Sequence, residues 1–358
     1  AMLTKVDGKN SELPVTFKNF MVTLQSFIIF IFSSLFITLY GYCLFMGKKT
    51  AAKRLKYHLL LYKFANYVIN HIPQVRTYYE NKYGETFNKP AVTISNHQSH
   101  FDLMCIMMLT PKLVILTNDW VWHSPFYGRL IHFADFLPIA EGLDKTVEDL
   151  KPLITEGYSV MIFPEGTRSE DCSILRFHRG AFYVAEKLKL DIIPVLIHGV
   201  GHVLPKKEWI MRKGAFHIRI FNRITPDDSR YSSDYITRSK EVRHFYIQQY
   251  ELLAKEVENA DYYADLVLHN YIYKGPAIER TVRKNLKQNQ NYSALINSTP
   301  NEGNYTINDT EGYGEAALLL ALVKKNLEVN CFLPDSDHLE LASNCASVPS
   351  NLHFCLMK

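Results

Sequence analysis

The chain has 358 residues, of which 47% are hydrophobic, and a formal net charge of +4. This length predicts one large domain or two smaller ones with a sizeable core. The small charge argues against a nucleic-acid partner, which needs a strongly basic stripe with interleaved aromatic residues, but it suits a membrane surface. The six cysteines form no CxxC pair and have no metal-ligand spacing, so we expect reduced thiols and no bound metal.

An uncharged apolar stretch covers residues 20–46. It is longer than the about 20 residues that span a bilayer and longer than the roughly 7 to 15 apolar residues of a signal peptide. We therefore expect a retained transmembrane anchor. Polar residues such as Gln25 and Thr38 dilute the stretch, which leaves a second interpretation open, a helix lying in one leaflet.

Basic residues follow this stretch more densely than they precede it. The five that follow are Lys48, Lys49, Lys53, Arg54 and Lys56, against three lysines before it. The positive-inside rule therefore predicts that the larger C-terminal part lies on the cytoplasmic side. Residues 48–72 are predicted to form a basic amphipathic helix, which either lies on anionic headgroups or packs on the domain that follows.

Short apolar runs then alternate with helix-like segments. The runs cover residues 91–94, 112–116, 136–139, 159–163, 192–198 and 216–221, and a long helix is expected at about 239–257. Strands that alternate with helices predict an α/β fold with a largely parallel sheet flanked by helices. In such sheets, the loops at the carboxyl ends of the strands carry the chemistry.

The first such loop contains His97 and Asp102, separated by four residues. A carboxylate that accepts a hydrogen bond from one imidazole nitrogen leaves the other nitrogen free as a base. Five helical positions turn a side chain by about 140° net, so the pair meets only if His97 precedes a helix and Asp102 lies in its first turn.

Two other interpretations of this loop remain open. Ser99 with Asp102, and Ser95 with Gln98, have the spacing of capping boxes at a helix start. A metal-dependent hydrolase that uses His97, His100 and Asp102 is the second interpretation, but no further ligand cluster with metal spacing occurs in the sequence.

A second loop follows the predicted strand at 159–163. Glu165 could accept a hydrogen bond from a hydroxyl group or hold Arg168, Gly166 permits close backbone approach and Thr167 offers a hydroxyl group. The planar guanidinium of Arg168 suits phosphate or carboxylate. Taken alone, the loop could equally be a turn with a Glu–Arg ion pair. Further along, Arg179 lies at a predicted helix start and is a candidate anion contact.

Four blocks of sequence together carry a family resemblance. They are HxxxxD at 97–102, FPEGTRS at 163–169, a basic-Gly-Ala-Phe segment at 177–182 and Ile-Pro-Val at 193–195. In order and spacing, over roughly residues 70–230, they resemble the glycerolipid acyltransferases, and in particular the 1-acyl-sn-glycerol-3-phosphate (lysophosphatidic acid) acyltransferases. The agreement of several blocks is far more specific than any one of them.

The resemblance implies an O-acyltransferase of phospholipid biosynthesis that works at a membrane. Its acyl donor would be acyl-CoA or acyl-carrier protein as a co-substrate, its acceptor a lysolipid hydroxyl group, and it would need no cofactor, metal or acyl-enzyme. His97 would be the general base and Asp102 would orient it. Glu165, Gly166, Thr167 and Arg168 would bind the acceptor headgroup.

One block departs from the family pattern. Members that use glycerol phosphate acceptors usually have an arginine where this chain reads Ala140–Glu141. The loss of such a charge-assisted phosphate contact leaves two further hypotheses open. The acceptor could be another hydroxylated lipid, such as an amino-acid lipid, or the chain could be a non-catalytic lipid-binding or scaffold domain of a larger membrane assembly.

The C-terminal part resembles the first half of a Rossmann-like methyltransferase domain. Strands are predicted at 304–309, 327–333 and 352–356, with a glycine loop at 310–314 and a helix at 315–325. Thr310–Glu311 replaces the expected leading glycine, so we expect a degenerate or truncated module without a cofactor. Because Ala1 precedes Met2, we also expect ends that differ from the natural ones.

The predicted organisation follows the chain from end to end. It comprises an N-terminal tail (1–19), the transmembrane anchor (20–46), the basic amphipathic helix (48–72), the acyltransferase domain (73–260), a linker and helix (261–300) and the partial methyltransferase-like module (301–358).

Overall fold

The computed structural model of the chain describes residues 9–10, 14–118, 122–124, 128–139, 142–287 and 290–357. Contacts divide the chain into two units. The first unit covers Phe17–Leu253, and the second combines the segments 1–16 and 254–358.

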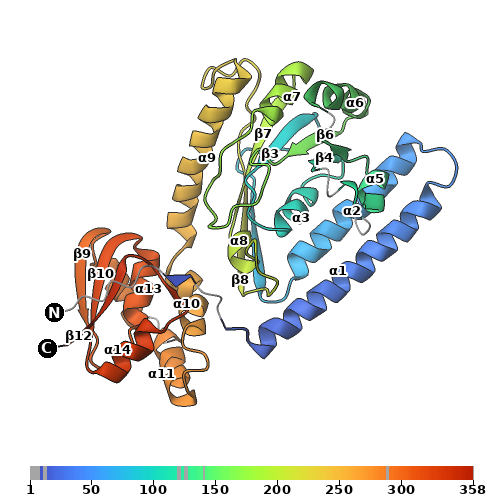
Figure 1. Cartoon of the computed structure of the whole chain (residues 1–358). Helices are drawn as coiled ribbons and strands as arrows, with labels where there is room; N and C mark the ends of the chain where they lie inside the picture. Colours follow the sequence, from blue (N-terminus) through green and yellow to red (C-terminus); the bar gives the residue numbers. More distant parts are fainter. Residues whose placement is uncertain are drawn as a thin grey trace. The chain divides into compact units, whose positions relative to one another are not determined.

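A seven-stranded sheet forms the centre of the first unit, in the order β2-β8-β7-β3-β6-β4-β5 (Figure 1). Its strands are β2 (Val75–Glu80), β3 (Ala91–Ser95), β4 (Leu113–Thr117), β5 (Leu137–Pro138), β6 (Ser159–Ile162), β7 (Asp191–His198) and β8 (Gly214–Ile220). All neighbouring strands are parallel except β7 and β8, which are antiparallel. The predicted α/β fold with a largely parallel sheet is therefore confirmed.

Helices cover both faces of this sheet. They are α1 (Phe17–Leu44), α2 (Ala51–His71), α3 (Phe101–Met107), α5 (Gly128–Phe133), α6 (Leu143–Thr155), α7 (Gly180–Leu188), α8 (Val200–Val203) and α9 (Tyr235–Val257). Figure 1 shows α1, α2, α3 and α5 on one side of the sheet and α6, α7 and α9 on the other. Strands β3 and β7 are buried along their whole length, as expected for parallel strands covered on both faces.

Helix α1 packs against the first unit near both of its ends. In its first half, the hydroxyl group of Thr23 accepts a hydrogen bond from the backbone N–H of Met211, at 2.9 Å. In its second half, Gly41 lies so close to Phe133 that a Cβ atom there would approach the ring to 2.5 Å. Only a residue without a side chain fits this contact, so the sequence position of Gly41 fixes where α1 meets α5.

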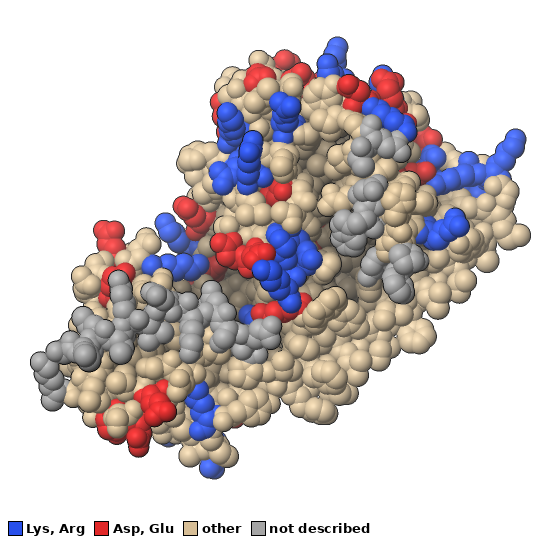
Figure 2. Space-filling model, in the orientation of Figure 1, with Lys and Arg blue, Asp and Glu red and all other residues tan. Residues whose placement is uncertain are grey.

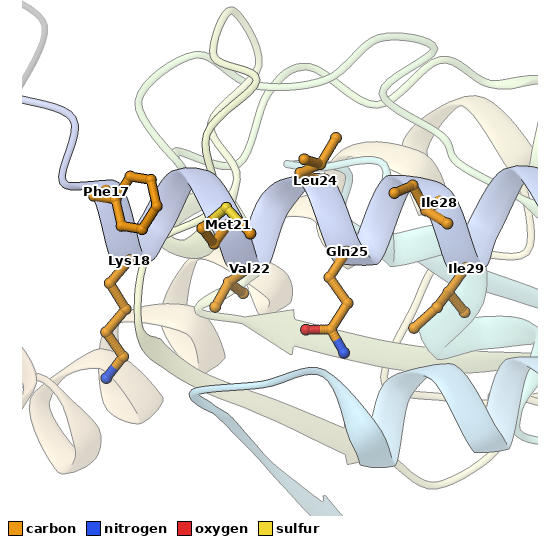
Figure 3. Close-up of a pocket in the computed structure, with 8 residues that line it drawn as sticks. All are labelled: Phe17, Lys18, Met21, Val22, Leu24, Gln25, Ile28 and Ile29. Carbon is orange, nitrogen blue, oxygen red and sulfur yellow. The ribbon is translucent and has the colours of Figure 1, made fainter.

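The rest of the α1 surface is apolar and exposed. The most apolar 18-residue window of this helix has a mean hydropathy of 2.2 and is 11% buried, so α1 is long and apolar enough to cross a membrane. Figure 2 shows its flank as a surface without charged side chains, with basic side chains at the far end. A shallow, largely apolar depression follows the N-terminal half of the helix, where Figure 3 shows Lys18 and Gln25 pointing to the same side.

Helix α2 packs on the sheet through one face. Thr50 caps its start by accepting a hydrogen bond from the backbone N–H of Lys53. The side chains of Tyr57, Leu61 and Ala65, spaced four residues apart, are almost completely buried. This arrangement agrees with a helix packed on the domain that follows, the second of the two interpretations above.

The second unit has a three-stranded parallel sheet in the order β12-β10-β9, flanked by helices. Its elements are β9 (Glu302–Asn308), β10 (Asn326–Leu333), β12 (Leu352–Leu356), a short pair formed by β1 (Lys9–Asn10) and β11 (Ser347–Val348), and the helices α10 (Ala260–His269), α11 (Pro276–Lys287), α12 (Gln290–Ser298), α13 (Glu315–Val323) and α14 (Ser336–Ser343). The strands lie where the sequence predicts them. In the region 261–300, Val267 and Val282 are fully buried in the core of this unit, because α10 and α11 pack against α13 and the sheet.

The glycine loop of the second unit is filled by its own acidic side chains. The two carboxylate oxygens of Asp309 accept hydrogen bonds from the backbone N–H groups of Gly312 (2.8 Å) and Gly314 (2.9 Å). The buried carboxylate of Glu315 accepts from the backbone N–H of Tyr313 and from the amide of Asn285. Backbone donors that an anionic ligand would need are therefore already satisfied.

Candidate active site

Two loops meet at the carboxyl edge of the sheet. Strands β3 and β6 are parallel neighbours, with Ile94 opposite Ile162, so the segments that follow them leave the sheet side by side. The backbone N–H of Ser169 donates a hydrogen bond to the carbonyl of His97, at 2.8 Å. This bond joins the HxxxxD segment to the FPEGTRS segment.

His97 and Asp102 form the hydrogen-bonded pair that the sequence predicts. The Nδ1 atom of His97 lies 2.9 Å from Oδ2 of Asp102. Helix α3 begins at Phe101, so Asp102 lies in its first turn and His97 precedes it. The imidazole stacks on Phe163, with ring centroids 4.1 Å apart. Its side chain is 21% exposed, and Nε2 makes no hydrogen bond with a described residue.

Asp102 is fixed by its own backbone surroundings. Its side chain is fully buried, and Oδ2 also accepts hydrogen bonds from the backbone N–H groups of Gln98 (2.6 Å) and Ser99 (2.7 Å). Three hydrogen bonds therefore converge on this one oxygen. The same oxygen thereby fixes the loop that carries His97.

The capping-box interpretation is only half right. Asp102 does reach back to the N–H of Ser99, but the hydroxyl group of Ser99 donates to the carbonyl of Leu204, at 2.9 Å. Ser95 and Gln98 do not form a box, since their side chains donate to the carbonyls of Asn96 and Cys172. The hydroxyl group of Ser99 therefore binds a distant segment of the chain instead of completing a capping box.

Glu165 is buried beneath the dyad. It is 2% exposed, and its two oxygens accept hydrogen bonds from the backbone N–H groups of His97 and Leu175, both at 2.9 Å. The guanidinium of Arg243 on α9 donates to the carbonyl of Leu175. Glu165 thus holds the backbone of His97 in place and makes no ion pair with Arg168 among the described residues, unlike the simple turn considered above.

The pKa of Glu165 is raised from its usual value of 4.5 to about 7, first by burial and secondarily by the charge of Asp102, while the backbone donors oppose this. Because the folded protein holds this proton more tightly than the unfolded chain, the stability contribution of Glu165 falls as pH rises from about 4.5 to about 7. We expect the unfolding free energy of the wild type, relative to Glu165→Gln, to fall by about 2 to 3 kcal/mol between pH 5 and pH 8. Urea denaturation in detergent at several pH values measures this difference, and parallel curves for the two proteins would contradict it.

The rest of the FPEGTRS loop faces outward. Gly166 adopts a φ of +65°, and a Cβ atom there would lie 3.3 Å from the ring of His178. The hydroxyl group of Thr167 lies 3.4 Å from Nζ of Lys206. Arg168 is half-buried and makes no hydrogen bond or ion pair with any described residue. Partial burial lowers the pKa of Arg168 while the charge of Asp102 opposes this, so its cation lies within the field of the dyad.

Other predicted positions lie farther out or outside the described residues. Arg179 is exposed at the start of α7, and no hydrogen bond with a described residue ties it to the dyad. Ala140 and Glu141, the departure from the family pattern, lie outside the described residues.

The metal-hydrolase interpretation finds no support in the described part of the chain. No group of three His, Cys, Asp or Glu side chains there has an arrangement that could hold a metal ion. All six cysteines are free thiols and belong to no such group.

A third segment lies beside the two loops of the site, and the sequence analysis did not predict it. The segment 204–213, here called the α8–β8 loop, begins at the Leu204 carbonyl that binds Ser99 and brings Lys206 to Thr167. Its only sequence signal is the Lys206–Lys207 pair soon after the Ile-Pro-Val block, which the four-block pattern does not include.

Comparisons with known proteins match the part of the chain that carries the dyad. Residues 67–198 match the Acyltransferase family model. A 1-acyl-sn-glycerol-3-phosphate acyltransferase of Chlamydomonas reinhardtii is 30% identical over 145 residues, which cover 39% of this chain and 44% of that protein. The chloroplastic enzyme of that name from Arabidopsis thaliana is 31% identical over 140 residues (38% and 39%), and the human alpha form is 28% identical over 163 residues (42% and 58%). The chain spans about half the length of these relatives.

A solved structure shares the fold. The crystal structure of the 1-acyl-sn-glycerophosphate acyltransferase PlsC from Thermotoga maritima superposes with a TM-score of 0.56 at 22% identity, and the match covers 66% of this chain and 96% of that one. At this identity the similarity concerns the fold. Together, these matches confirm the resemblance to the glycerolipid acyltransferases, and to their lysophosphatidic acid acyltransferases in particular, that the four sequence blocks indicate.

Proposed function

We propose that the chain is an O-acyltransferase that moves a fatty acyl group from a thioester to a hydroxyl group of a lysolipid, with lysophosphatidic acid as the acceptor. The observation that carries this proposal is the 2.9 Å bond between His97 and Asp102, with Nε2 of His97 left available. The nearby cation of Arg168 supports an anionic acceptor, and the names of the relatives support the same chemistry.

The proposed reaction needs one base and no covalent enzyme intermediate. Nε2 of His97 takes the proton of the acceptor hydroxyl group while its oxygen attacks the thioester carbonyl. The tetrahedral intermediate expels the thiolate, and the imidazolium of His97 then gives the proton to this thiolate. Asp102 stabilises that imidazolium through Nδ1, and the stack on Phe163 holds the ring plane.

The donor is proposed to be acyl-CoA or acyl-carrier protein. Both present the same thioester to the base, so the dyad serves either. The proposed chemistry uses no cofactor and no metal, since the proton moves only between the acceptor, His97 and the leaving thiolate.

We propose further that α1 holds the first unit on the cytoplasmic leaflet. Its contacts at Thr23 and Gly41 are 18 residues apart, which is about 27 Å along a helix. A steep span would carry the packed catalytic unit into the hydrocarbon, so these contacts favour a helix lying in one leaflet. The basic residues after α1 support the cytoplasmic side.

We expect Arg168→Ala to act mainly on the acceptor. Loss of a charge-assisted bond to a phosphate costs about 1.5 to 3 kcal/mol, so KM for lysophosphatidic acid should rise about 10- to 100-fold while KM for the acyl donor stays nearly constant. Steady-state kinetics with each substrate varied in turn measure the two constants. Weaker donor binding with an unchanged acceptor KM would contradict the assigned role.

Thioester consumption tests the proposed function against a non-catalytic scaffold. We expect free thiol to appear from acyl-CoA or acyl-carrier protein only when a lysolipid is added. Binding of lysolipid without any release of thiol would favour the lipid-binding scaffold instead.

A further inference from the structure

The α8–β8 loop begins against the dyad. The carbonyl of Leu204 accepts the hydroxyl hydrogen bond of Ser99, whose own N–H binds Asp102. The next cationic side chain lies two residues farther along. It belongs to Lys206.

Lys206 is placed beside the FPEGTRS loop. Its Nζ lies 3.4 Å from the hydroxyl oxygen of Thr167 and 3.7 Å from a carboxylate oxygen of Glu170, and its side chain is 26% exposed. An ammonium group has three donors, so at least one remains for a ligand. Arg168, the next residue after Thr167, has a guanidinium without a partner among the described residues. Lys206 thus lies beside the loop that carries Arg168, whose charge acts on Asp102 and His100.

The neighbouring Lys207 has a different environment. Its side chain is 76% exposed, and it forms the closer ion pair with Glu170, at 2.8 Å. If a bound anion pairs with Lys206, Glu170 still has its ion pair with Lys207. Figure 2 shows basic side chains gathered next to acidic ones near α8, beside a hollow in this face.

The far part of the same loop reaches the apolar helix. Trp209 is 71% exposed, and its ring lies 6.2 Å from that of Phe27 on α1. Met211 donates its backbone N–H to Thr23. An exposed tryptophan beside an apolar helix suits the membrane–water interface. The loop therefore runs from the apolar helix α1 to the segment that carries the dyad.

We propose that Lys206 and Arg168 form a two-cation subsite for the phosphate monoester of the acceptor. This inference rests on the proposed function, which it deepens by adding Lys206 to the residues that bind the headgroup. A phosphate monoester carries about 1.5 to 2 negative charges at neutral pH, so a second cation adds to its binding more than to that of a diester. Lys206 would thereby supply a phosphate contact from outside the four family blocks.

Binding of sn-glycerol 3-phosphate to the full chain in detergent tests this subsite without turnover. We expect Lys206→Ala to weaken binding about tenfold or more, and Lys207→Ala to weaken it less than threefold, although both changes remove one positive charge. Lys206→Arg should restore much of the affinity. Lys206→Gln, which keeps the length of the side chain, serves as a second variant, and thermal melting of each protein checks its fold.

Turnover with three acceptors tests the phosphate subsite independently of the proposed acyl transfer. With lysophosphatidic acid, lysophosphatidylglycerol and monoacylglycerol, Lys206→Ala should reduce the preference for the monoester about tenfold. Equal effects of Lys206→Ala and Lys207→Ala, or no binding of the probe by the wild type, would overturn the subsite even if acyl transfer occurs. Binding that depends on Lys206 in a protein that transfers no acyl group would refute the function and leave the anion subsite standing.

Discussion

His97→Ala should lower kcat on the order of 10³-fold or more and leave the protein folded. Nε2 of His97 is the proposed base, so its loss should remove general-base catalysis, which contributes about 10²- to 10⁴-fold. The side chain is partly exposed and rests on Phe163, so its removal creates little buried void. Thiol release under saturating substrates measures kcat, and thermal melting measures the fold.

His100→Ala is the matched control for this variant. It removes the same side-chain type three residues along, from a position that has no hydrogen bond to Asp102 among the described residues. We expect kcat to change less than tenfold, since the proposed mechanism assigns His100 no proton transfer. Near-normal turnover in His97→Ala would refute the mechanism, and a large loss in His100→Ala would revive the metal interpretation.

Asp102→Asn should lower kcat on the order of 10²- to 10⁴-fold with little change in either KM. The amide oxygen can still accept the backbone N–H groups of Gln98 and Ser99, so the loop keeps its shape. The variant lacks the negative charge that stabilises the imidazolium of His97, which forms only as the reaction proceeds. Steady-state kinetics should therefore show a loss in kcat alone.

Asp102→Ala tests how much the carboxylate stabilises the loop, apart from its role in catalysis. It leaves two buried backbone N–H groups without an acceptor, at about 1 to 3 kcal/mol each. We expect its unfolding free energy to fall well below that of Asp102→Asn, in urea titrations at one pH. Equal stability of the two variants would mean that Asp102 does not hold the loop as described.

The sheet and the dyad could be predicted from local sequence. Buried parallel strands are short apolar runs, and the strand at 159–163 was found within one residue of β6. The geometric condition on the dyad, with His97 before α3 and Asp102 in its first turn, follows from helix geometry alone.

The surroundings of the dyad could not be predicted because they depend on contacts between distant segments. The sequence predicts that Glu165 binds a hydroxyl group or Arg168, yet it is buried and accepts hydrogen bonds from the backbone N–H groups of His97 and Leu175. Lys206 enters the site because Ser99 binds the carbonyl of Leu204, a contact across 105 positions. Neither contact joins residues at a regular sequence spacing, so the sequence alone does not indicate it.

Product analysis by mass spectrometry tests the central claim most directly. The wild type and His97→Ala are each incubated with an acyl thioester and a panel of lysolipids that includes lysophosphatidic acid, a lysophosphodiester and an amino-acid lipid. The account predicts phosphatidic acid as the main product of the wild type and almost none from His97→Ala. No acylated product from any acceptor, or an equal yield from both proteins, would contradict it.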